Sequence, residues 1–201
     1  MIKKGLFLLK ENEIEKLNKK IIEEHEDQEI VLGNGSVDSS MILIGEAPGA
    51  KEVEAKLPFV GQAGKYLEEF LHVLELDRKE LYITNTVKFR PTKISSKTGG
   101  KINRAPSKKE IENFKGYLFD EIEIIQPQVI ITLGNVPLKT ITGNEKDKIG
   151  ELHGKAIKVN IKDREYKVFP LYHPAAVIYR RELKEVYIED LKKLKKFKEK
   201  A

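Results

Sequence analysis

The chain has 201 residues, 40% of them hydrophobic, so it is long enough to bury a core as one domain and too apolar for a disordered chain. It contains no cysteine, which excludes disulfides, thiolate metal sites and a cysteine nucleophile. No apolar run is long enough to span a membrane, and the short apolar patch near the N-terminus does not predict a signal peptide, so we expect a cytoplasmic protein. The net charge of +5 favours an anionic partner.

Apolar residues recur at helical spacing in several segments of the chain. These segments are residues 11–26, 64–76 and 107–125, a short stretch opened by Gly134, and residues from about 181 onward. Ser107 and Glu110 form a capping box that marks the start of the third segment. Continuous apolar or β-branched runs predict strands at residues 41–45, 82–84, 129–133 and 166–172. Because strands alternate with helices, we expect a parallel sheet with helices on both faces, in a single domain of residues 1–201.

Three polar residues directly follow three of the predicted strands. Glu46 comes after the first strand, Asn85 after the second and His173 after the last. The carboxyl ends of parallel strands meet at one edge of a sheet, where ligands bind in open α/β folds, so these side chains should lie together. Each has a simpler explanation by itself: a helix-capping carboxylate, a turn asparagine or a packed histidine. Their joint placement favours a pocket, which the rigid corners at Pro48-Gly49 and Pro174 would preorganise.

Positive charge is concentrated in one segment. Residues 88–109 contain eight Lys or Arg and no Asp or Glu, so this segment carries +8 and the rest of the chain −3. Its serines and glycines predict a long surface loop, and a loop of this charge is typical of a surface that binds phosphates. A second basic run lies at the C-terminus, where a solvated helix end favoured by the helix dipole is the simpler interpretation.

The chain contains four short motifs, in this order: "GEAPG", "LPFVGQAG", "YITNTVKFRP" and "LYHPAAVI". In order and spacing they resemble the motifs of the uracil-DNA glycosylase superfamily, most closely the family 4 type of bacteria and archaea, and the resemblance covers about residues 30–181. It implies a three-layer α/β/α fold with a central four-stranded parallel sheet. It also implies a hydrolase that cleaves the N-glycosidic bond of uracil in DNA, for base excision repair. We further expect a monofunctional enzyme that is a monomer and needs no soluble cofactor.

The resemblance assigns binding roles to the residues around the expected pocket. A base must be flipped out of the duplex before it can be attacked, so the pocket has to receive it and read its edge. Phe59 matches the aromatic residue that stacks on the flipped uracil, and Asn85 the amide that meets its O4 and N3–H. Backbone groups around Gly45, Glu46 and Ala47 would approach the base closely.

The resemblance also assigns the catalytic roles. His173 would donate to uracil O2, where negative charge develops as the bond breaks. Glu46 would position or activate the attacking water and offset the positive charge on the sugar. Glu52 is a second candidate for this carboxylate, with Glu54 behind it, and the spacing does not decide between Glu46 and Glu52.

DNA contacts are expected from the basic loop and from the segment after His173. The expected DNA-binding residues are Lys88, Arg90, Lys97, Lys101, Arg104, Ala176, Val177 and Arg180. The basic members would bind phosphates, and residues 173–181 would pack into the minor groove beside the vacated stack.

The chain departs from the family 4 pattern in two ways. Family 4 enzymes carry four cysteines that hold an iron–sulfur cluster, whereas Phe89 and Phe114 stand here where two cysteines are expected, and the N-terminal pair would fall near residues 18–21. We therefore expect no metal site and no cluster, with apolar packing in its place. The second departure is the basic insertion at about residues 92–102, which contains no histidine that could trap DNA covalently.

Two alternatives to uracil excision stay open. A glycosylase of the same fold could prefer another deaminated base, such as hypoxanthine or xanthine, because an amide can meet other lactam edges. A non-catalytic DNA-binding relative is the other alternative. The presence of Glu46, Phe59, Asn85 and His173 together argues against it.

Overall fold

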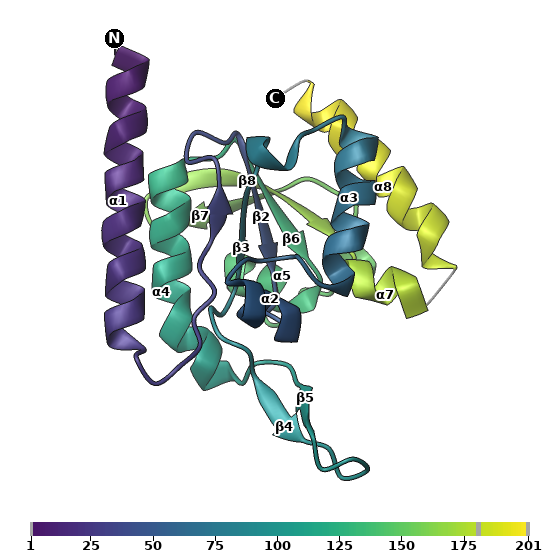
Figure 1. Ribbon diagram of the computed structural model, residues 1–201. Helices are drawn as coiled ribbons and strands as arrows, with labels where there is room; N and C mark the ends of the chain where they lie inside the picture. Colours follow the sequence, from purple (N-terminus) through teal and green to yellow (C-terminus); the bar gives the residue numbers. More distant parts are fainter. Residues whose placement is uncertain (1, 180–181, 200–201) are drawn as a thin grey trace.

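The computed structural model describes residues 2–179 and 182–199, which are arranged around one sheet of six strands (Figure 1). The strands are β1 (Asn34–Gly35), β2 (Met41–Gly45), β3 (Tyr82–Asn85), β6 (Val129–Leu133), β7 (Ile157–Ile161) and β8 (Arg164–Leu171), in the spatial order β1-β3-β2-β6-β8-β7. The four central strands are parallel, which confirms the predicted four-stranded core of the sheet. The antiparallel edge strands β1 and β7 were not predicted, because β1 has only two residues and the three apolar residues of β7 alternate with exposed polar ones instead of forming a continuous apolar run.

Two layers of helices cover the sheet, as predicted (Figure 1). One layer contains α3 (Gln62–Leu74), α7 (Pro174–Tyr179) and α8 (Leu183–Lys198). The other contains α1 (Ile2–Glu24), α4 (Lys108–Ile125) and α5 (Asn135–Thr142). Neighbouring residues of β2 divide between the two faces: Leu43 packs with the first layer, and Ile42 and Ile44 pack with the second. This burial on both faces explains why the central strands read as continuous apolar runs.

Helix α1 is longer than the sequence pattern predicts. It begins at Ile2 instead of near residue 11, and its first turns extend past α4 (Figure 1). Leu6 and Leu9 on these turns are 52% and 53% exposed, and Phe7 alone of these apolar residues packs against the core, so the turns show no buried stripe at helical spacing. Three short elements were also missed: the helices α2 (Ala50–Ala55) and α6 (Ile149–Leu152) and the 3₁₀ turn at Arg78–Glu80. Each is too short to show a helical repeat of apolar residues. Among the described residues, no helix is long and apolar enough to cross a membrane.

The basic insertion forms a hairpin that projects from the body of the molecule (Figure 1). Its strands β4 (Thr92–Ile94) and β5 (Lys101–Asn103) pair antiparallel with each other and form a separate two-stranded sheet. The hairpin leaves the body shortly after β3 and returns at the start of α4, where Ser107 caps the helix with Glu110 as predicted. It therefore stands beside the carboxyl ends of the parallel strands.

Candidate active site

The strand ends bring the predicted polar residues to two adjoining hollows. Gly45 at the end of β2 lies opposite Asn85 at the end of β3, Glu46 follows Gly45, and His173 lies two residues beyond β8. Asn85, His173 and Phe59 line a cavity of about 350 Å³. An adjoining hollow of about 270 Å³ shares His173 with this cavity and is lined by Glu46. The structure thus places three of the four expected pocket residues in the main cavity and the fourth, Glu46, in the hollow beside it, with His173 lining both.

Phe59 is held at the cavity by an uncommon backbone conformation. Its φ of 53° lies in the left-handed region, which costs energy for a residue with a side chain and is found where neighbouring groups enforce it. The Arg78 guanidinium donates to the carbonyls of Pro58 (2.5 Å) and Phe59 (3.2 Å), and Gly64 leaves room for the Phe59 carbonyl, which would lie 2.2 Å from an added Cβ. These contacts fix the Phe59 ring, whose centroid is 6.3 Å from that of His173.

Asn85 and Phe59 meet over the bare backbone of Gly45. A Cβ on Gly45 would lie 2.4 Å from Asn85 Oδ1 and 2.6 Å from Phe59 Cζ, so no side chain fits at this position. Asn85 is only 3% exposed although it lines the cavity. A buried amide beside an aromatic ring can offer a planar heterocycle both a donor and an acceptor, together with a stacking surface.

His173 is set up as a neutral hydrogen-bond donor. The backbone N–H of Ala175 donates to its Nδ1 (3.1 Å), so Nδ1 is an acceptor and the proton of the neutral ring sits on Nε2. Burial lowers the pKa of His173 to about 4, so the ring is neutral at pH 7. Its Nε2–H is therefore available to a group in the cavity.

Glu46 is half-buried, and its burial raises the pKa of its carboxyl above the ordinary value. The turn after β3 fixes the backbone beneath it. Thr86 donates to the Gly45 carbonyl through both its backbone N–H (2.8 Å) and its hydroxyl (2.9 Å), and the Val87 N–H donates to the Glu46 carbonyl (3.2 Å). The carboxylate thus stands on a rigid strand end, and a raised pKa makes it a stronger base than an exposed glutamate.

Glu52 does not have the surroundings of a free base. It is 9% exposed, and both carboxylate oxygens accept backbone N–H groups, from Gly61 (2.7 Å) and Gly49 (3.1 Å). These bonds join the loop after Glu46 to the loop that carries Phe59. Glu52 therefore braces the wall of the cavity, and its geometry does not support the expected second catalytic carboxylate.

Asn103 is a cavity residue that sequence reasoning missed. It ends β5, at the base of the hairpin, and lines both the main cavity and the hollow beside Glu46. The Arg90 Nε donates to its Oδ1 (2.7 Å), which fixes the amide. The signal that could have identified it is the same one that identified Asn85, a polar residue at a strand end, but a three-residue strand inside a basic loop hides that signal.

The comparisons with known proteins agree with this geometry. A family model described as the uracil DNA glycosylase superfamily matches residues 32–195. This chain belongs to the uracil-DNA glycosylase superfamily. It is 38% identical over 169 residues to the type-4 uracil-DNA glycosylase of Sulfurisphaera tokodaii, covering 82% of this chain and 73% of that one. It is 38% identical to the type-4 enzyme of Archaeoglobus fulgidus (82% and 79% covered) and 34% identical to that of Thermotoga maritima (84% and 82% covered).

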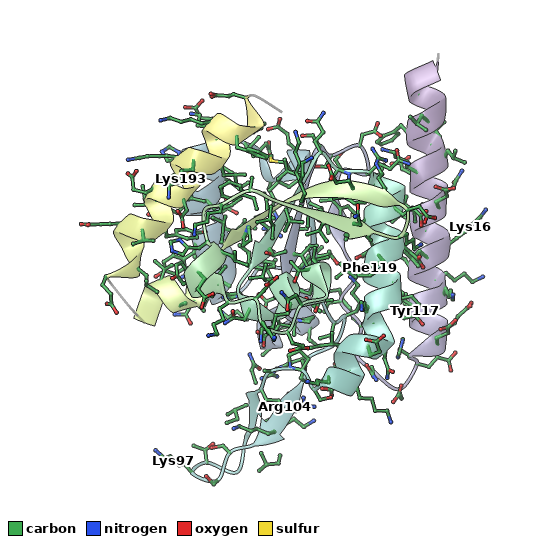
Figure 2. The ribbon with its side chains drawn as sticks, turned by 180° about the vertical axis from the view of Figure 1, so that it is seen from behind. Lys16, Lys97, Arg104, Tyr117, Phe119 and Lys193 are labelled. Atoms are coloured by element: carbon green, nitrogen blue, oxygen red, sulfur yellow. The ribbon has the colours of Figure 1, made fainter. Side chains whose placement is uncertain are left out.

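Two of the basic residues expected to bind DNA are already engaged by carboxylates of this chain. Lys88 is 0% exposed and paired with Glu121, so the prediction that it binds DNA is wrong. Arg104 at the base of the hairpin is bound by both oxygens of Glu110 (2.6 and 2.7 Å) and is not a free cation. Lys97 at the tip and Lys101 on β5 are exposed, as a phosphate contact requires (Figure 2).

The segment after His173 forms helix α7 and only partly fits its expected role. Val177 is 6% exposed and packs in the core with α3 and α8, so the prediction that it faces DNA is wrong. Ala176 is half-buried, near the start of the helix. Arg180 lies outside the described residues.

An aromatic cluster fills the region where a family 4 enzyme is expected to hold its iron–sulfur cluster. Phe114 is 1% exposed, and its ring lies 5.6 Å from that of the half-buried Phe89, as predicted. His25 stacks on Phe114 with a centroid distance of 4.4 Å, and Tyr117 packs against both rings. Iron–sulfur clusters are held mainly by cysteine thiolates, and the chain has none. Within residues 2–179 and 182–199, no three His, Asp or Glu side chains form a metal-binding group either. These residues do not fit an iron–sulfur cluster.

Proposed function

We propose that the chain removes uracil from DNA by hydrolysing the bond between C1′ of the deoxyribose and N1 of the base. The observation that supports this proposal is the placement of Phe59, Asn85 and His173 around one cavity at the strand ends, with Glu46 in a hollow that shares His173 with it. These residue types come from four separate motifs of the sequence, and each has the environment that its role requires. The superfamily membership of the chain and its type-4 relatives support the same substrate.

Recognition follows from the surfaces that the cavity presents. The flipped base would stack on the ring of Phe59, with its O4 and N3–H facing the Asn85 amide. Gly45 lets the base approach the backbone, because any side chain there would occupy the same space. Cytosine presents an amine and a bare ring nitrogen at the corresponding positions, so a fixed amide that pairs with uracil mismatches cytosine.

Chemistry follows from His173 and Glu46. When the C1′–N1 bond breaks, the electron pair goes to the base, and negative charge spreads to O2, where the His173 Nε2–H donates. The sugar becomes positively charged, and the Glu46 carboxylate stabilises that charge and accepts the proton of the attacking water. The water oxygen ends on C1′, the uracil anion takes up a proton from solvent and Glu46 releases its proton to solvent, so the products are uracil and an abasic site. No group in the proposal forms a covalent bond to DNA, so the enzyme would be monofunctional.

DNA would be held by surfaces on either side of the cavity. The hairpin carries Lys93, Lys97 and Lys101 exposed and contains no acidic residue, which suits contact with phosphates. The start of α7 would approach the minor groove through Ala176. The hairpin would therefore replace the contacts that we had expected from Lys88.

The reaction as proposed needs no cofactor, and we predict that the purified protein contains no iron. Elemental analysis checks this prediction, and stoichiometric iron would contradict it. The packing of Phe114 against Phe89 and His25 supports the prediction, because these rings occupy the region that a cluster would need. The monomeric state and the cytoplasmic location expected from the sequence also stay predictions.

A single assay tests the function against its alternatives. Oligonucleotides that contain uracil, hypoxanthine or xanthine are incubated with the protein, and abasic sites are cleaved with alkali. We expect strand breaks for uracil only, and only after alkali, because the enzyme leaves the backbone intact. Breaks without alkali would contradict the monofunctional assignment. Preference for hypoxanthine or xanthine would indicate another deaminated base as substrate, and binding without excision would indicate a non-catalytic relative.

A further inference from the structure

The Lys88 ammonium lies against the end of β3 and makes three buried hydrogen bonds. Its ammonium donates to the backbone carbonyl of Asn85 (2.9 Å), to the Thr84 hydroxyl (2.5 Å) and to Glu121 Oε2 (2.5 Å). An ammonium group has three donors, so all of them are used. One of the three holds the main chain of the residue whose side chain lines the cavity.

Glu121 completes the network from helix α4. Its carboxylate accepts the Thr84 hydroxyl (3.1 Å to Oε2) and the Tyr82 hydroxyl (3.3 Å to Oε1) besides the Lys88 ammonium. The Lys88 and Glu121 side chains are both 0% exposed. Tyr82 and Thr84 belong to the same strand as Asn85, so the pair ties three of the four residues of β3 to α4.

Stability alone is a poor explanation for this arrangement. Removing two charges from water costs about as much as their attraction returns, and apolar residues of similar size often replace a buried ion pair without loss of stability. Burial lowers the pKa of the Lys88 ammonium, and Glu121 opposes that shift. What an apolar pair could not supply is a directed bond to the Asn85 carbonyl.

The bond to Asn85 matters because the turn from Asn85 to Lys88 also holds the backbone of Gly45 and Glu46. Between Asn85 and Lys88, Thr86 and Val87 bind the carbonyls of Gly45 and Glu46. The Asn85 Oδ1 and the Phe59 ring both lie so close to the backbone of Gly45 that an added Cβ there would collide with them. A small movement of the Asn85 backbone would therefore change the position of its amide relative to both neighbours.

We propose that Lys88 and Glu121 are positioning residues, whose buried pair fixes the Asn85 amide in the orientation that reads uracil. This proposal rests on the proposed role of Asn85 in uracil recognition. The pair does not touch the substrate. It acts through the strand end, from the face of the sheet opposite to the cavity.

A double-mutant cycle tests the proposal. The variant Lys88→Met/Glu121→Leu replaces both charges by apolar side chains and leaves no unpaired charge. We expect this variant to unfold at nearly the wild-type temperature and to bind DNA as the wild type does. Its single-turnover rate of uracil excision should fall about 10- to 100-fold, because a small displacement of a substrate-positioning group costs about that much. In an Asn85→Ala background the same two substitutions should lower the rate of excision by less than about threefold, because there is no amide left to position.

The matched control removes a surface ion pair that joins the same helix to the turn between β7 and β8. Asp120 and Lys162 lie 2.8 Å apart with 39% and 42% of their side chains exposed, and Asp120→Asn/Lys162→Gln should leave excision unchanged. An equal loss from the Lys88 and Glu121 substitutions with and without Asn85 would overturn the proposal, and so would wild-type excision by the double variant.

If the double variant does not fold, Thr84→Val takes its place in the cycle. That variant removes the hydroxyl between the two charges, and its smaller loss should likewise vanish in the Asn85→Ala background. Wild-type excision by Asn85→Ala alone would instead refute the proposed role of Asn85.

Discussion

The cavity and the hairpin stand at the same edge of the sheet but are built in opposite ways. The cavity joins residues from five stretches of the chain, including Asn103 at the base of the hairpin, and its parts are fixed by buried bonds and close contacts, such as those around Gly45. The hairpin is one continuous segment whose two strands pair only with each other, and its lysines point into solvent (Figure 2). Changes in the cavity should therefore act through geometry, with large effects on the reaction. Changes in the hairpin should act through charge, with modest and additive effects on binding.

The largest expected effect is on the two groups to which we assign the chemistry. Glu46→Gln and His173→Ala should each lower single-turnover uracil excision by about 10²-fold or more, the usual loss for a general base or an oxyanion donor. DNA affinity should stay near normal, because neither side chain is expected to bind phosphates. Quenched-flow excision assays and a binding titration measure the two quantities. Wild-type rates in both variants would refute the assigned roles.

The geometric character of the cavity is tested at Gly45. In Gly45→Ala the new methyl group would collide with the Asn85 amide and the Phe59 ring, and excision should fall about 10- to 100-fold. Gly116→Ala on α4 is the matched control, because nothing lies within 4 Å of an added Cβ there. It should stabilise the helix by about 0.5–1 kcal/mol and leave excision unchanged. Equal excision by the two variants would show that the contact at Gly45 does not shape the site.

The hairpin should respond to loss of charge alone. Lys93, Lys97 and Lys101 replaced together by Gln should lower the slope of log affinity against log salt by roughly 2–3, because each phosphate contact releases about 0.7–0.9 of a counterion. Excision by saturating enzyme should survive. The control variant replaces Lys16, Lys19 and Lys20, three exposed lysines of α1, by Gln. It removes the same total charge, so an equal change in slope from both variants would show that the hairpin makes no specific contact.

The same contrast explains what the sequence could predict. The parallel core of the sheet, the capped start of α4 and the strand-end positions of Glu46, Asn85 and His173 were predictable, because each depends on a local pattern of burial or capping. Lys88 and Val177 were assigned wrongly because a charged or apolar letter in a motif does not say which way its side chain points. The partner that buries Lys88 is Glu121, which is 33 residues away.

Asn103 and the brace at Glu52 escaped for a related reason. Asn103 ends a strand of only three residues inside the basic loop, and Glu52 accepts from the backbone of Gly49 and Gly61. Neither arrangement leaves a periodic signal in the chain. Residues that follow a buried apolar strand can be predicted, whereas residues on a short polar strand or between two loops need the structure.

The smallest expected effect is a change in pH dependence, which separates the two titrating groups of the cavity. Burial raises the pKa of Glu46 and lowers that of His173 to about 4. As base, Glu46 must be deprotonated, so kcat/KM should fall as the pH falls through its raised pKa, at a higher pH than for an exposed glutamate. The neutral His173 should add no inflection near its ordinary pKa of about 6.5. The pH profile of kcat/KM for the wild type and for His173→Gln checks this: the acid limb should be shared by both. A wild-type inflection near 6.5 that His173→Gln lacks would show that His173 titrates as an exposed imidazole and that the cavity does not hold it neutral.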